Sequence, residues 1–279
     1  MIRNPLLRKE FRQRMRTLRA PVVVTGYFTA MALLTFFLLY ENVQGQLSMF
    51  LPARSEQVFV TLSLLQTVIV AFLTPAFAAG AISGERERRT LAVLLTTPLS
   101  PAGILIGKIL SSSALLALLL VVTLPLYSLV FLFGGAVPEE VMAVFAFQLF
   151  TVALIAALSV MWSTISLRSG WSTILSYTTV TWMVLITGGL GYGLQWIAAR
   201  FPMDYFLSHW GKVLLSLNPL WILAAIENPG LAERNGWLRF VGVYTAMCGI
   251  LFLVSVWRLR PQSFRLVPGI VRTDERNYQ

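Results

Sequence analysis

Six long stretches without a single charged residue constrain what this chain can fold into. A transmembrane helix needs about 20 consecutive, mostly apolar residues, so each stretch is predicted to cross a membrane. The expected fold is an all-α integral membrane protein, with six transmembrane helices in a single membrane domain. The six stretches are residues 21–40, 59–82, 109–133, 141–166, 171–191 and 240–257.

A seventh uncharged stretch, residues 213–226, is too short to span and contains Asn218-Pro219. It is predicted to be a re-entrant or interfacial segment before the last span. It belongs to a long outer segment, residues 192–239, which has few charges and several tryptophans. Because tryptophan prefers the membrane interface, this segment is expected to fold back into the outer leaflet.

The composition agrees with a membrane protein, since 57% of the 279 residues are hydrophobic and only 12% are charged. Soluble proteins carry about a quarter charged residues. The net charge is +10, and the basic residues flank the apolar runs. This pattern indicates membrane lipids with anionic headgroups as partners, and no nucleic acid.

Most of the 22 Lys and Arg residues fall on one side of the predicted spans. The positive-inside rule places that side in the cytoplasm. Both termini, the loop 83–101 and the tail 258–279 are then cytoplasmic, in a multi-pass protein of the cell (inner, cytoplasmic) membrane. The first apolar run is long enough to span and no small-x-small cleavage site follows it, so an anchor is expected rather than a cleaved signal peptide.

Residues 4–19 form a patterned element before the first span. Asn4 is a suitable N-cap and Pro5 suits the first helical position. Apolar residues recur there at steps of three and four, which predicts a basic amphipathic "elbow" helix in the inner headgroup layer. A generic basic flank is the alternative. The residues expected at the membrane interface are Arg8, Lys9, Phe11, Arg12, Met15, Arg16 and Arg19.

The loop between the second and third spans carries five consecutive charged residues, Glu85 to Arg89. Leu91, Leu94 and Leu95 then follow at the spacing of one helix face. A short helix with such a ridge could insert into the groove of a partner protein, or it could rest on lipid. The spacing alone does not favour either alternative.

The loop residues resemble the cytoplasmic signature of type-2 ABC transporter permeases. The matching pattern is Glu85–x–Glu87–x–x–Thr90–Leu91, then Leu94–Leu95–x–Thr97–Pro98–Leu99–Ser100, then Ile104 and Gly107-Lys108. The order of elbow helix, six spans and re-entrant segment also resembles that family. The chain departs from it at Arg89, where many members have a glycine.

The resemblance implies a permease that works as a dimer, with each chain bound to a cytoplasmic ABC ATPase subunit. The ATPase would hold ATP and Mg, so no cofactor is expected on this chain. The second permease could be another copy or a related chain. By the same resemblance, a coupling helix in the loop is formed or framed by Glu85, Glu87, Thr90, Leu91, Leu94, Leu95, Thr97 and Pro98.

Catalytic and metal-binding constellations are not expected. His209 is the only histidine and Cys248 the only cysteine, so one chain cannot form a zinc-type cluster of these ligands. Two other functions stay open: a lipid-modifying membrane enzyme that uses Asp204 and His209, and a non-transporting scaffold that recruits a cytoplasmic protein.

The predicted spans contain no ionisable residue except tyrosine and the single cysteine, which argues against a carrier driven by protons or sodium. Their hydroxyl groups, most numerous in the fifth span, could line a pathway or bond to helix backbones. Gln148 is the most polar side chain of the fourth span, and we expect it to face protein rather than lipid. The cargo is left open, with lipids, polysaccharides, peptides and drugs as the choices that the resemblance implies.

Overall fold

The computed structural model describes residues 19–43, 52–91, 100–132, 137–201, 205–228 and 235–259. Within these ranges all regular structure is helical, as predicted. The helices are α2 (Arg19–Val43), α3 (Pro52–Ala78), α4 (Ser83–Glu87), α6 (Pro101–Val122), α7 (Leu124–Leu132), α8 (Pro138–Ile165), α9 (Ser169–Thr181), the π-helix η1 (Trp182–Ile186), α10 (Thr187–Arg200), α11 (Tyr205–Ser216), α12 (Pro219–Glu227) and α13 (Gly236–Leu259).

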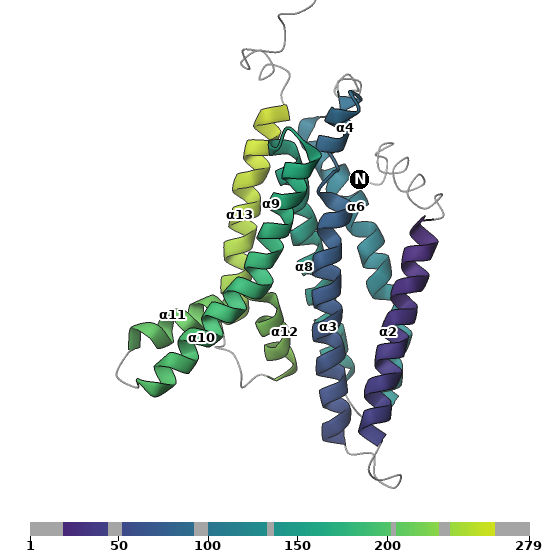
Figure 1. The fold of residues 1–279 in the computed structure, drawn as a ribbon, viewed down its shortest axis with the longest axis vertical. Coiled ribbons are helices and arrows are strands. Elements are labelled where there is room, and N and C mark those ends of the chain that lie inside the picture. Colours follow the sequence, from purple (N-terminus) through teal and green to yellow (C-terminus); the bar gives the residue numbers. More distant parts are fainter. Residues whose placement is uncertain are drawn as a thin grey trace, which may run out of the picture.

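Among the described residues, six helical segments are long and apolar enough to cross a membrane, which confirms the predicted number of spans. They run alternately up and down through one elongated bundle (Figure 1). We call the two ends of this bundle the α4 end and the α12 end. The segments are Pro21–Glu41, Glu56–Glu87, Pro101–Leu132, Pro138–Ile165, Ser169–Arg200 and Gly236–Leu259.

Local capping signals set the beginnings of several helices. Ser100 precedes α6, and its hydroxyl accepts a hydrogen bond from the Gly103 amide at 3.1 Å. Pro101, Pro138 and Pro219 each occupy the first turn of a helix, where the missing amide hydrogen costs nothing. These signals are readable in the sequence.

Helices α3 and α8 form the centre of the bundle. In the most apolar part of the spans that contain α3 and α8, 56% and 50% of the residues are buried. The corresponding share is 17% in the spans of α2 and α13. Apolar side chains pack along the length of α3 and α8 in three clusters, so these two helices connect both ends of the molecule. Gln148 of α8 is 1% exposed, which confirms that it faces protein.

The fifth span is longer than the predicted stretch 171–191. It continues as α9, η1 and α10 to Arg200, and α10 bends away from the bundle beside α11 (Figure 1). The five-residue π-helix Trp182–Ile186 lies at the bend. The sequence predicted a shorter span because glycines and Gln195 alternate with the apolar residues of α10.

The stretch 213–226 is divided between two helices, since α11 ends at Ser216 and α12 begins at Pro219. Asn218 caps α12, and its side-chain oxygen accepts from the amides of Leu220 at 2.8 Å and Trp221 at 3.2 Å. Helix α12 packs against both α3 and α8. Of the predicted elbow helix, residues 4–18 lie outside the described residues and Arg19 begins α2.

Candidate coupling site at the α4 end

The second span does not run straight into α4. Helix α3 ends at Ala78, and a turn over residues 79–82 leads into α4. Ser163 of α8 accepts from the amides of Ile82 at 3.0 Å and Ser83 at 2.9 Å. Ser172 of α9 donates to the Ala79 carbonyl at 2.6 Å. Two neighbouring helices therefore satisfy the backbone groups that the turn leaves unpaired.

Helix α4 ends in a Schellman motif. The amide of Thr90 donates to the Glu85 carbonyl at 2.9 Å, and the amide of Arg89 donates to the Arg86 carbonyl at 3.0 Å. Arg89 occupies the left-handed position of this motif, with a φ of 58°. Glycine is usual at this position because it has no Cβ. Arg89, which stands where many family members have glycine, therefore keeps the turn but adds backbone strain.

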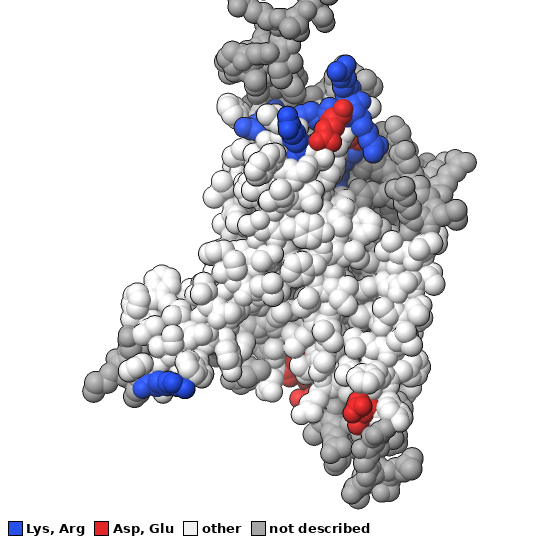
Figure 2. All heavy atoms as spheres, viewed as in Figure 1, with Lys and Arg blue, Asp and Glu red and all other residues white. Residues whose placement is uncertain are grey.

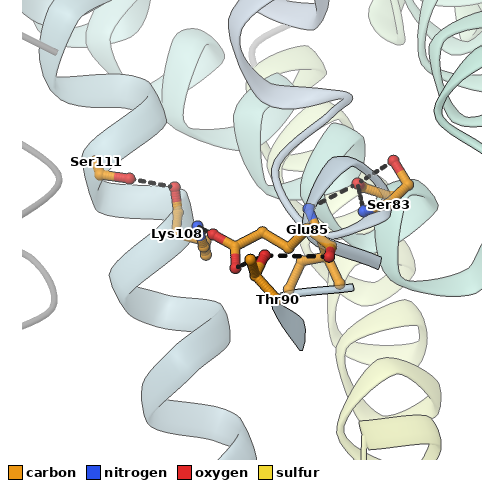
Figure 3. A network of polar contacts seen from close by, with 7 residues as sticks. Ser83, Glu85, Thr90, Lys108 and Ser111 are labelled. Carbon is orange, nitrogen blue, oxygen red and sulfur yellow. Dashed lines mark hydrogen bonds and ion pairs between the residues drawn. The ribbon is translucent and has the colours of Figure 1, made fainter. Parts of the chain in front are cut away.

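Glu85 forms an ion pair inside the protein. Its carboxylate lies 2.7 Å from the Lys108 ammonium of α6, and the two side chains are 29% and 6% exposed. The Thr90 hydroxyl lies 3.3 Å from the same carboxylate and 3.2 Å from the Glu85 carbonyl (Figure 3). This pair ties the turn after the second span to the beginning of the third.

Glu87 contacts the beginning of α9. Its carboxylate accepts from the Ser169 amide at 2.6 Å and from the Ser169 hydroxyl at 2.8 and 2.9 Å. Carboxylates are favourable at the first turn of a helix, where amides lack partners.

Arg86 contacts the end of α8. Its guanidinium donates to the carbonyls of Ser166 at 2.6 Å and Thr164 at 3.2 Å. Arg258 of α13 donates to the neighbouring carbonyl of Ile165. Two cations thus cover the carbonyl-rich end of α8, where positive charge is favourable.

Leu91 is 4% exposed and packs into the protein's own core with Ile82, Ile104, Leu105 and Leu259. The other four residues of the expected coupling element, Leu94, Leu95, Thr97 and Pro98, lie outside the described residues. The described members, Glu85, Glu87, Thr90 and Leu91, all make contacts within the chain. They frame the loop and connect it to α6, α8 and α9.

Sequence reasoning missed several residues of this site. It left Arg86 outside the family pattern, with anchoring at the inner membrane surface as one interpretation. It named Ser163 only among the span hydroxyls that could line a pathway or bond to helices, and it gave no role to Ser169. It treated Lys108 only as part of the family pattern and as the beginning of the next span. The position of Lys108 was a signal that could have been used. It is the single basic residue soon after Pro101, and the preceding loop contains two carboxylates that need a partner.

Charge is unevenly distributed between the two ends. Basic and acidic atoms crowd together at the α4 end, while most of the visible surface between the ends is uncharged (Figure 2). The described basic residues at the α4 end are Arg86, Arg88, Arg89, Lys108, Arg168 and Arg258.

Among the described residues, no group of three His, Cys, Asp or Glu side chains could hold a metal ion. His209 of α11 is exposed and stacks on Tyr205, with ring centroids 6.1 Å apart. Asp204, its expected partner in an enzyme, lies outside the described residues.

The family comparison agrees with this architecture. The sequence model of a family described as "ABC-2 family transporter protein" matches residues 5–256, nearly the whole chain. The chain belongs to this family. As an ABC-2 transporter protein it is a multi-pass integral membrane protein, and the family's membrane subunits are typically non-catalytic and in general associate with an ABC ATPase. A search of curated proteins gave no match.

Proposed function

We propose that this chain is the transmembrane permease subunit of an ATP-driven ABC exporter. Two permease chains, identical or related, associate with cytoplasmic ATPase subunits that bind ATP and Mg. The loop after α4 contacts the ATPase, and its movement is transmitted to the spans. The direction of transport is inferred from the resemblance of the loop pattern to permeases of exporters.

The observation that carries this proposal is the set of contacts around α4. Glu85 forms an ion pair with Lys108 of α6. Arg86 donates a hydrogen bond to the end of α8, and Glu87 accepts one from the beginning of α9. A force applied to residues 92–99 would therefore act on three helices besides α3. A loop that merely rested on lipid would not need such connections.

Charge supports the orientation that the proposal requires. The basic residues of the α4 end would face the cytoplasm, in agreement with the positive-inside rule. Both termini would then be cytoplasmic, and the α12 end would face the outside of the cell membrane.

The test is gentle purification of the tagged chain from its native membrane, followed by identification of partners and an assay of ATP hydrolysis. We expect a stoichiometric ATPase subunit. Leu94→Glu should abolish its association or its activity, because a charge would enter an apolar groove. Leu94→Met is the matched control, since it keeps an apolar side chain of similar volume.

A folded chain that co-purifies with no ATPase would contradict the proposal. An ATPase that hydrolyses ATP equally with Leu94→Glu would remove the loop from the coupling route. A bound partner without ATPase activity would instead support the scaffold alternative.

A further inference from the structure

Helices α10 and α11 form an antiparallel pair that leaves the bundle sideways (Figure 1). We call these two helices the wing. An added Cβ at Gly191 would lie 2.8 Å from the Leu215 side chain, and one at Gly211 would lie 2.8 Å from a neighbouring glutamine, Gln195. The Gln195 amide also donates to the Ser208 carbonyl at 2.7 Å. Small residues thus let the two helices pack closely, and the wing is one compact unit.

The surface of the wing is rich in exposed aromatic rings. Six aromatic side chains, in α10, in α11 and directly after α10, are at least 47% exposed. They are Tyr192, Trp196, Phe201, Tyr205, Phe206 and Trp210. In water such a concentration of apolar surface is unfavourable and marks a contact site. Because tryptophan and tyrosine prefer the boundary between headgroups and acyl chains, the wing has the composition of an element at a membrane interface.

The exposed surface of the wing continues that of the fifth span. Trp182 and Leu185 of η1 are 52% and 57% exposed, and Leu190 of α10 is 53% exposed. Helix α10 follows η1 without a break. The outward apolar faces of membrane spans contact the acyl chains of lipids. Lipid that covers the fifth span would therefore also reach the wing.

The length of the fifth span explains what its bend achieves. Ser169–Arg200 is 32 residues long, and a straight helix of that length would measure about 48 Å. The hydrocarbon core of a bilayer is only about 30 Å thick. The part from the beginning of α9 to the end of η1 already extends about 27 Å. The bend at η1 therefore keeps α10 along the leaflet at the α12 end, instead of projecting it into water.

Charge places the far end of the wing at the level of the lipid headgroups. Figure 2 shows basic atoms at this far end, at a similar height to the acidic atoms below the bundle. Charged side chains avoid the hydrocarbon core, so both groups of atoms mark one headgroup layer. Asp204, in the connection between the two helices, lies outside the described residues. The helices themselves carry two basic residues, Arg200 and Lys212, and no acidic residue, which suits contact with phosphates.

Arg200, the last residue of α10, is positioned by Trp196. Its guanidinium carbon lies 3.9 Å from the centre of the Trp196 ring, within the range of a cation–π interaction. Such a contact leaves most of the five N–H groups of a guanidinium able to donate hydrogen bonds. Guanidinium groups often bind phosphate oxygens through two parallel hydrogen bonds. Trp196 therefore holds Arg200 where it can donate to a lipid phosphate.

We propose that the wing is a docking surface for phospholipids of the leaflet at the α12 end. Its aromatic rings contact acyl chains near the headgroup boundary, and Arg200, held by Trp196, donates to a lipid phosphate. Continuity with the fifth span and the position of the charged end favour lipid over a second copy of the chain. The inference goes beyond the permease proposal and does not depend on it, because it requires only that the chain spans a membrane.

The experiment measures the surroundings of the wing by electron paramagnetic resonance. A nitroxide label is attached to Phe206→Cys in a Cys248→Ala background, and the full-length chain is reconstituted in phosphatidylcholine vesicles. Collisions of the label with oxygen report lipid, and collisions with a water-soluble nickel chelate report water. Ile250→Cys, at a site 64% exposed on α13, is the lipid reference. Arg88→Cys, at an exposed site of the α4 end, is the water reference.

The label at position 206 should behave as a group at the acyl boundary. We expect oxygen collisions at least about half as frequent as at position 250, and nickel collisions about fivefold less frequent than at position 88. Nickel collisions as frequent as at position 88 would mean that the wing lies in water, and would overturn the inference. A label that collides with neither reagent would mean that protein covers the wing, which would also overturn it.

The phosphate contact is tested in the same labelled chain. Without its cation the far end of the wing should sink toward the acyl chains, so Arg200→Gln should lower nickel collisions at position 206 about twofold. Arg200→Lys, which keeps a charge for the phosphate, is the matched control and should leave them unchanged. Collisions at position 250 should be the same in both variants, which shows that the bundle is intact.

A change of lipid tests the same contact without any change at Arg200. In vesicles of a galactolipid, which has no phosphate, nickel collisions at position 206 should also fall about twofold. Equal collisions in galactolipid and phosphatidylcholine, or equal collisions with Arg200 and with Arg200→Gln, would each overturn the phosphate contact.

Discussion

At the residue scale, the backbone of Arg89 carries strain. A residue with a Cβ costs about 1–2 kcal/mol in the left-handed region, and Arg89 has a φ of 58°. The hydrogen bonds of the Schellman motif hold it there. Family members with glycine at this position would form the same turn without this cost.

Arg89→Gly should therefore raise the stability of the chain, by about 0.5–1 kcal/mol. Thermal unfolding of the purified chain would measure the change. Arg88→Gly is the matched control, because Arg88 has an ordinary φ of −78°. Glycine there adds only flexibility and should lower stability. Equal effects of the two changes would show that strain at Arg89 is not released.

The ion pair between Glu85 and Lys108 gives a second prediction. Glu85→Gln leaves the ammonium of Lys108 almost fully buried without its carboxylate, and should cost about 1–3 kcal/mol. The double change Glu85→Gln with Lys108→Met removes the buried charge and should recover most of that loss. Unfolding of both variants in detergent tests this. A double variant no more stable than Glu85→Gln alone would contradict it.

At the element scale, Asn218 joins the irregular part of the fifth span to α12. A π-helix turn alters the regular hydrogen bonding of a helix. The Asn218 amide donates to the carbonyl of Val184 in η1 at 2.7 Å and to the Thr187 hydroxyl at 3.2 Å. Gly188 passes so close that an added Cβ would lie 2.6 Å from this amide.

Asn218→Asp separates the two roles of this side chain. Aspartate is as good an N-cap as asparagine, so capping alone predicts little change. Aspartate would also place a buried carboxylate against the Val184 carbonyl, because Asn218 is 3% exposed. We expect a loss of at least 2 kcal/mol, roughly as large as in Asn218→Ala. A variant as stable as the unmodified chain would show that the contact with η1 is unimportant.

At the scale of the whole molecule, the two ends differ in charge chemistry. At the α4 end, the charged side chains of Glu85, Arg86 and Glu87 form contacts between helices. Among the described residues of the α12 end, the carboxyl group of Glu227 is buried, with 7% of the residue exposed. The contacts at the α4 end are those that the proposed coupling role would require.

Stability should therefore depend on pH through Glu227. Its pKa in the folded chain is about 7, above the ordinary value of 4.5. The folded state binds the proton more tightly, so this contribution is fully present below about pH 4.5. It is lost as the pH rises through about 7. The loss should be at most about 3 kcal/mol and absent in Glu227→Gln. Melting temperatures from pH 5 to pH 8 would measure it, and identical pH profiles would contradict it.

The sequence by itself determined the membrane class and the number of spans, and the caps of α6 and α12, which were not predicted, also lie in the local sequence. These features depend on local properties: long uncharged runs, Ser100-Pro101 and Asn218-Pro219. It also predicted a specific role for the loop 83–101, through its charges and family pattern. Local signals of this kind survive in any tertiary arrangement.

The tertiary structure alone decided where the charged side chains of that region go. Glu85 meets Lys108 across 23 residues, and Glu87 meets Ser169 across 82. Glu227 lies outside every predicted span, yet α12 packs it among spans. Such contacts arise when distant segments pack together, because burial and the partners of a charge depend on the whole bundle rather than on neighbouring residues.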